Sequence, residues 1–222
     1  MANREDILLV EGETDKALFS VICDLIKIDP TIKVAPPKEL GGMSNSKAGV
    51  FTIIPALLKQ LPDGEINRLA VIVDADHPEN HGMGYRKTLE EFGRIVSEAG
   101  YTRIFPRGLR GGILFQHDDG LSDLGFWIMR DNQTDGTIED WLKYCVHETD
   151  LPLFQNACRA IERFAKPQKF SQFNRVKAEI ATWLAWQRIP GQGAHAACRA
   201  GLIDRNKDWF AGLTDWLSRV FS

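Results

Sequence analysis

The 222-residue sequence has few cysteines and no long apolar run. Its four cysteines lie far apart without a CxxC pair, which excludes a disulfide-stapled mini-protein and favours reduced thiols in a cytoplasmic protein. No stretch reaches the roughly 18 to 20 consecutive apolar residues that cross a bilayer, and residues 1–6 carry no signal-peptide pattern. We therefore expect no membrane association. The cysteines are Cys23, Cys145, Cys158 and Cys198.

The sequence also lacks an excess of charge of one sign. Its 27 basic and 30 acidic residues give a formal net charge of −3, and 44% of the residues are hydrophobic. These values exclude an intrinsically disordered chain and a strongly basic nucleic-acid coat protein. They do not exclude an enzyme that acts on nucleic acid, because local charge decides such binding.

The first three-quarters of the chain alternates short β-type runs with amphipathic helical runs. Ile7–Val10 and Leu69–Val73 are continuous apolar runs, typical of strands buried on both faces. The pattern predicts an α/β fold, a Rossmann-like and mostly parallel sheet flanked by helices. Pro55 lies inside one helical pattern and should kink that helix or shift its start. Other strand patterns cover residues 31–35, 112–116 and 126–129, and helical faces cover residues 18–25, 50–61, 89–96 and 138–145.

After about residue 150 the β-type runs stop, and three helical faces follow. We therefore predict an α/β domain of residues 1–148 and a helical segment of residues 149–222 packed on it. No internal repeat and no low-complexity tract is present. The three faces are Phe154/Cys158/Ile161, Val176/Ile180/Trp183/Leu184 and Phe210/Leu213/Leu217.

Acidic side chains follow both of the buried strands. Glu11 comes directly after the first, and Asp74 and Asp76 come directly after the second. Ligands of open parallel sheets bind at the carboxyl ends of the strands, so these three side chains should converge. Clustered carboxylates repel one another unless a cation neutralises them, and their hard oxygens suit Mg²⁺ or Mn²⁺. The alternative for Asp74 and Asp76 is ordinary turn chemistry.

Gly12 and Asp15 follow Glu11 at the start of the first predicted helix. Gly12 permits a tight turn and can bring the helix N-terminus close to a phosphate group. Asp15 falls in the first helical turn, where helix capping explains it at least as well as metal binding.

The Glu-Gly-x-x-Asp motif after the first strand and the Asp-x-Asp motif about 60 residues later resemble the Toprim domain. Topoisomerases, bacterial primases, small ribosomal-RNA maturases and the overcoming-lysogenization-defect (OLD) nucleases share this domain. The resemblance covers roughly residues 5–130 and is nearest to a Toprim-like branch close to the OLD nucleases. It implies a Toprim-like fold, Glu11 as metal ligand and general acid or base, and Asp74 and Asp76 as Mg²⁺ ligands.

The same resemblance extends to two later residues. It implies that Glu139 helps hold a second metal ion and that Lys177 faces the scissile phosphate. Each residue also has a structural interpretation, since Glu139 fits a first-turn acid beside a Thr137–Asp140 capping pair. Lys177 neighbours an apolar helical face and fits a snorkelling surface lysine. The chain has no ATPase domain, primase zinc motif or tyrosine-bearing topoisomerase domain, so the resemblance indicates a type of site rather than a biological role.

Residues 159–188 hold seven basic residues and two acidic ones. They form either a solvated helical face or a track for a phosphate backbone, with Lys169 and Arg175 as phosphate-binding candidates. Phe170 and Phe173 are candidates for base stacking.

Lys47 is a further phosphate-binding candidate, since it follows the Gly41–Gly42 turn. The segment lacks the glycine before lysine that a P-loop requires. His77 and His81 follow the Asp pair, but isolated loop histidines are more often surface residues.

We predict a Mg²⁺-dependent enzyme acting on phosphodiesters, a nuclease in particular, with DNA or RNA as its partner. One alternative is a non-catalytic Toprim scaffold that binds nucleic acid or protein. Another is a nucleotidyl or sugar-nucleotide transferase that uses Asp74 and Asp76. A homodimer or a partner protein is expected, because the chain has no large targeting domain.

Overall fold

A computed structural model describes residues 4–35, 46–108, 111–163 and 169–222. Its strands are β1 (Glu5–Val10), β2 (Thr31–Val34), β3 (Ile66–Asp74), β4 (Tyr101–Ile104), β5 (Ile113–His117) and β6 (Leu124–Met129). Its helices are α1 (Glu13–Ile26), α2 (Lys47–Gln60), α3 (Gly84–Ser97), α4 (Ile138–Cys145), α5 (Leu151–Arg163), α6 (Arg175–Ala185), α7 (Ala194–Arg199) and α8 (Asp208–Phe221). Two 3₁₀ turns, η2 (Pro78–Asn80) and η3 (Gln172–Asn174), complete the described elements.

The six strands form one sheet in the order β2-β1-β3-β6-β5-β4. Neighbours from β2 to β6 pair in parallel, whereas β5 runs antiparallel to both β6 and β4. The predicted α/β fold with a mostly parallel, Rossmann-like sheet is therefore confirmed. Since β1 and β3 are parallel neighbours, the residues that follow them emerge at the same edge of the sheet.

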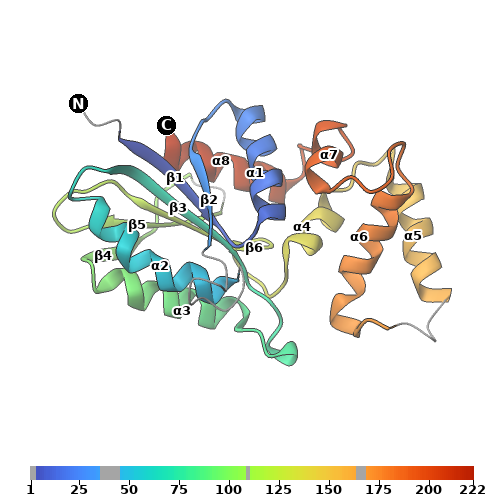
Figure 1. The fold of residues 1–222 in the computed structure, drawn as a ribbon, viewed down its shortest axis with the longest axis horizontal. Helices are drawn as coiled ribbons and strands as arrows, with labels where there is room; N and C mark the ends of the chain where they lie inside the picture. Colours follow the sequence, from blue (N-terminus) through green and yellow to red (C-terminus); the bar gives the residue numbers. More distant parts are fainter. Residues whose placement is uncertain (1–3, 36–45, 109–110, 164–168) are drawn as a thin grey trace.

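Helices cover both faces of the sheet (Figure 1). Ile7 and Leu9 of β1 face the core under α2 and α3, while Leu8 and Val10 face the core under α1 and α8. This two-sided burial explains why β1 reads as a continuous apolar run rather than an alternating one.

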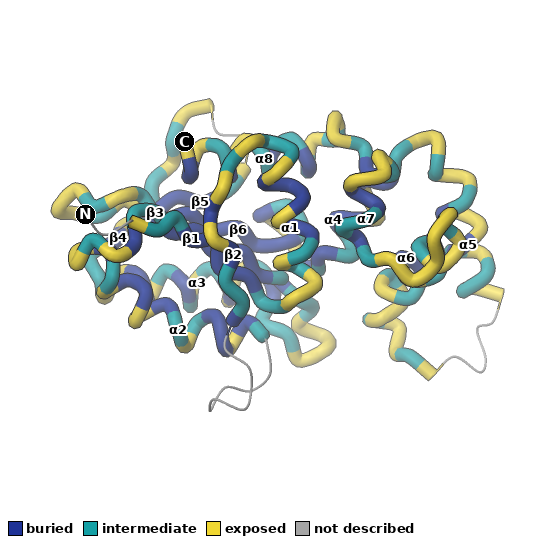
Figure 2. The backbone as a smooth tube through the Cα atoms, turned by 45° about the horizontal axis from the view of Figure 1, so that its top comes forward, coloured by how far each residue is buried: buried dark blue, intermediate teal, exposed yellow. Residues whose placement is uncertain are grey.

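Among the helices after residue 150, α8 and the α5–α6 pair lie in different places. Helix α8 packs on β3 and β6 beside α1, whereas α5 and α6 pair with each other beyond the sheet, next to α4 (Figures 1 and 2). Trp216 of α8 packs so closely on the sheet that a Cβ atom at Gly112 would lie 2.1 Å from its ring. The buried side chains of α5 to α8 join those of the sheet face in a single core.

Most predicted elements are present, with small differences. Helix α2 continues through Pro55, and β4 and α7 were not predicted. The Gly41–Gly42 turn lies outside the described residues. In the described part of the chain, no helix combines the length and apolar character needed to cross a bilayer. All four cysteines carry free thiols.

Candidate metal centre

The ends of β1 and β3 bring two of the predicted ligands into contact. Glu11 Oε1 accepts a hydrogen bond of 2.7 Å from the backbone N–H of Asp74. The parallel pairing of Leu9 with Val71 sets this register, so the two acids meet because their strands are adjacent. The prediction that Glu11 and Asp74 lie together at one edge agrees with this geometry.

Asp74 is also tied to the N-terminus of α4. Its Oδ1 accepts a hydrogen bond of 2.9 Å from the backbone N–H of Ile138, the first residue of that helix. A helix N-terminus carries unpaired N–H groups and a partial positive charge, which favour a carboxylate there. The contact fixes Asp74 and brings Glu139, the next residue of α4, toward the strand ends.

Asp76 lies in the same region, in a backbone conformation that the sequence did not predict. Its φ of 63° lies in the left-handed region, so the chain turns at Asp76 and does not continue as an extended strand. Its backbone N–H donates to Gly136 O at 2.9 Å, which anchors the turn. Asp74 and Asp76 nevertheless line one cavity.

That cavity has a volume of about 320 Å³ and lies between the end of β3 and the N-terminal part of α6. Glu139 and Lys177 line it together with the two aspartates, and Lys177 Nζ lies 3.4 Å from Glu139 Oε1. The later acid and lysine implied by the Toprim resemblance therefore face the Asp pair. Phe173 and His77 also line this space, with ring centroids 6.5 Å apart. We call this space the carboxylate pocket.

Burial and mutual repulsion raise the pKa values of the acids in this region. Burial, reinforced by the charges of Asp76 and Asp15, raises the pKa of Glu11 to about 7 despite the nearby Lys47 ammonium. Burial and the Glu139 charge raise the pKa of Asp15 to about 6. Burial, followed by repulsion from Glu11, raises the pKa of Asp74 well above its ordinary value. Without a cation, burial and repulsion thus favour the protonated forms of these carboxyls, whereas a bound cation would favour their ionised forms.

The remaining phosphate-binding candidates are engaged with other protein groups or lie on the surface. The N–H of Gly12 donates to Asp15 Oδ2 at 3.0 Å, so Asp15 does cap α1. Arg175 Nε donates to Glu179 Oε1 at 2.8 Å, and Lys169 is exposed. Thr137 and Asp140 form the expected capping pair at α4.

Lys47 differs most from its predicted role, because its ammonium is enclosed rather than open to a phosphate. Its side chain is 7% exposed, and Nζ lies 2.7 Å from Asp76 Oδ2. The spacing of Lys47 from Val50 and Ile54 on the buried face of α2 is a sequence signal that would have placed it inside.

The donor set fits Mg²⁺ or Mn²⁺ chemically, since it consists of carboxylate oxygens. In the described ranges, no three His, Cys, Asp or Glu side chains form a group that could hold a metal ion as they stand. The acids instead contact backbone N–H groups and lysines. Metal binding thus requires some carboxylates to exchange these partners for the ion.

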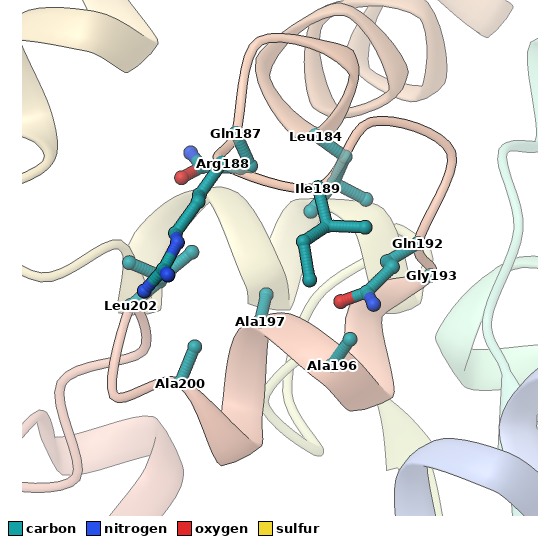
Figure 3. A pocket seen from close by; sticks show the side chains of 10 residues that line it. All are labelled: Leu184, Gln187, Arg188, Ile189, Gln192, Gly193, Ala196, Ala197, Ala200 and Leu202. Carbon is teal, nitrogen blue, oxygen red and sulfur yellow. The ribbon is translucent and has the colours of Figure 1, made fainter.

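A larger cavity of about 600 Å³ lies away from the acids, between the C-terminal end of α6 and α7. Figure 3 shows Leu184 and Ile189 facing the alanines of α7, with Arg188 extending along one side. Its ten lining residues include no acid, histidine or cysteine, so this cavity offers no group for acid–base or metal chemistry.

Residues 5–222 match the family described as "Protein of unknown function (DUF3226)". Since this match covers nearly the whole chain, the protein belongs to that family. No curated protein and no solved structure matches the chain.

Proposed function

We propose that the protein is a Mg²⁺- or Mn²⁺-dependent enzyme that acts on phosphodiesters, a nuclease of Toprim type. The observation that carries the proposal is the meeting of Glu11 with Asp74 at two adjacent strand ends, beside a cavity that Asp76, Glu139 and Lys177 line. The Toprim resemblance of the same acids adds nucleic acid as the substrate class. A cytoplasmic location belongs to the proposal and is supported by the free thiols.

Glu11, Asp74 and Asp76 would hold the ion, with Glu139 as a further ligand. A bound Mg²⁺ lowers the pKa of a coordinated water and offsets charge on the phosphate. Asp74 is prepared for this role because the Ile138 N–H fixes one of its oxygens.

Lys177 would interact with the phosphate itself. Its side chain is 67% exposed at the cavity and only loosely paired with Glu139, so the ammonium can turn to a bound anion. Hydrogen bonds from such a cation to phosphate oxygens stabilise the charge that develops during cleavage. Glu11, whose pKa is raised to about 7, has the protonation behaviour of a general acid or base near neutral pH.

A nucleic-acid strand would continue from the pocket along η3 and α6. Phe173 lines the cavity and offers a ring on which a base can stack. Lys169 is exposed nearby in sequence, and Arg175 is half-exposed although paired with Glu179. Contacts of these cations with phosphates would add binding that weakens as salt rises.

A second candidate function is a non-catalytic scaffold that binds nucleic acid or protein. The observation that favours it is the internal pairing of the acids, since Asp76 and Glu139 each contact a lysine. A scaffold needs the acids only for folding, whereas a nuclease needs them for turnover.

Cleavage assays with single-stranded DNA, duplex DNA and RNA in Mg²⁺ or Mn²⁺ separate the two candidates. The nuclease proposal expects metal-dependent cleavage that Asp74→Asn and Glu11→Gln abolish. Glu90→Gln is a matched control, because this exposed acid pairs with Arg86 on α3, outside the pocket. Equal activity in wild type and Asp74→Asn contradicts the proposal, and binding without metal-dependent turnover supports the scaffold.

A further inference from the structure

Lys47 is a buried lysine whose ammonium group contacts the Asp76 carboxylate. Its Nζ donates to Asp76 Oδ2 at 2.7 Å, to Ala75 O at 3.0 Å and to Thr88 Oγ1 at 3.3 Å. An ammonium group has three donors, so all of them are satisfied. A buried charge persists only when it is paired and hydrogen-bonded, which makes Lys47 a fixed cation rather than a mobile one.

The contacts of Lys47 join three separate elements. Lys47 begins α2, Ala75 and Asp76 follow β3, and Thr88 lies fully buried on α3. The ammonium therefore holds the left-handed turn at Asp76 against two helices. One oxygen of Asp76 points at Lys47, while the side chain remains 44% exposed and lines the carboxylate pocket.

With every carboxylate ionised, the charges around the pocket do not balance. Five acids act on one another in this region: Glu11, Asp15, Asp74, Asp76 and Glu139. The ammonium groups at hydrogen-bond or ion-pair distance from them, within the described ranges, are Lys47 and the largely exposed Lys177. One divalent ion would offset most of the excess, whereas a second ion at Asp76 would face the Lys47 ammonium directly and be repelled by it.

We propose that Lys47 is a positioning residue that fixes Asp76 and takes the place of a second metal ion, so the pocket binds one divalent cation. This inference rests on the proposed metal-dependent function. Lys47 acts through Asp76 and does not touch the substrate, because its ammonium is enclosed. The pocket therefore has two cations of different kinds: the fixed Lys47 ammonium, and one divalent ion that binds reversibly at Glu11 and Asp74.

Titration of the full-length protein with Mn²⁺, followed by calorimetry and by electron paramagnetic resonance of free Mn²⁺, tests the number of ions. Wild type is expected to bind one Mn²⁺ per chain, and Asp74→Asn is expected to lose it. Lys47→Met removes the fixed cation, so a second Mn²⁺ should bind beside Asp76. Lys47→Arg retains the positive charge and should still bind one Mn²⁺ per chain. Lys59→Met is the matched control, since Lys59 is exposed on the same helix and should also stay at one.

The outcomes are distinguishable. A wild type that binds two ions, both lost in the acid variants, overturns the inference but leaves the proposed function standing. A wild type that binds none overturns the proposed function itself. A folded Lys47→Met that still binds one ion also overturns the inference. The wild-type count needs no variant, so failure of Lys47→Met to fold does not prevent the test.

Discussion

The two walls of the carboxylate pocket are built differently. On the sheet side, Lys47 is enclosed and lies 2.7 Å from Asp76. On the helical side, Lys177 is 67% exposed and lies 3.4 Å from Glu139. Strand ends and buried contacts therefore hold one acid–lysine pair rigidly, whereas a surface helix presents the other loosely. Under the proposed function, the sheet wall would fix the positions of the metal ligands, and the helical wall would respond to a bound anion.

The largest expected effect comes from the sheet wall. Asp74→Asn should lower metal-dependent cleavage at least about 100-fold, because it removes a fixed negative ligand at the reaction centre. Glu139→Gln, on the helical wall, should lower it about 10-fold, as is typical when a supporting ligand is lost. Initial rates at saturating Mg²⁺ measure both. If Glu139→Gln is the more damaging change, the distinction between the walls is wrong.

The two lysines should also differ in their contribution to folding. Lys47→Met leaves Asp76 without its partner and removes the hydrogen bonds to Ala75 O and Thr88 Oγ1, although Ala75 O keeps the Gly84 N–H. The change should cost about 2 kcal/mol of unfolding free energy. Lys177→Met removes an exposed contact and should cost less than about 0.5 kcal/mol. Urea unfolding followed by circular dichroism compares them. Equal losses would show that burial of the ion pair does not set its contribution.

Phe173 tests whether the helical wall of the pocket contacts the substrate. Phe173→Ala should raise KM for single-stranded substrate about fivefold with kcat nearly unchanged, because one base-stacking contact is worth about 1 kcal/mol. Phe170→Ala is the matched control, since Phe170 is not among the residues that line the pocket. An equal rise in KM for both variants would place the stacking surface outside the pocket.

The last expected effect is the pH dependence of stability. The pKa of Glu11 rises from 4.5 to about 7 on folding, so the folded state binds this proton more tightly than the unfolded state. Its contribution to stability is therefore complete below pH 4.5 and is lost as pH rises toward 7. We therefore expect Tm to fall as the pH rises from 4.5 to 7.

Saturating Mg²⁺ should remove that fall, because the ion takes over the role of the proton. Thermal melts of wild type and Glu11→Gln at pH 5 and pH 7.5, with and without Mg²⁺, measure the difference. A wild-type dependence identical to that of Glu11→Gln would exclude Glu11 as its source.

The fold was largely predictable because the strongest patterns fall on the buried strands. Ile7–Val10 and Leu69–Val73 are apolar throughout, and the structure buries them on both faces. Strand β4 escaped prediction because its four residues, Tyr101–Ile104, lie at the sheet edge and are only partly buried. A short, half-exposed edge strand leaves little periodic signal.

The acids of the candidate site were predictable for a similar reason, and their partners were not. Glu11 follows β1 directly and Asp74 is the last residue of β3, so strand adjacency alone brings them together. The turn at Asp76 depends on Gly136 and Lys47, which lie far from it in sequence. Local patterns carry no information on such pairings, so the enclosed lysine was interpreted as a phosphate ligand.

The packing of α8 has a consequence for the order of folding. Helices α1 and α8, from opposite ends of the described chain, together cover one sheet face, and Trp216 fills the space above Gly112. That face cannot close until residues 208–221 have been synthesised, so its completion is a step of high contact order. Such steps are slow and leave apolar surface exposed meanwhile. Ribosome-bound chains that end before α8 should therefore recruit chaperones more strongly than chains that include it.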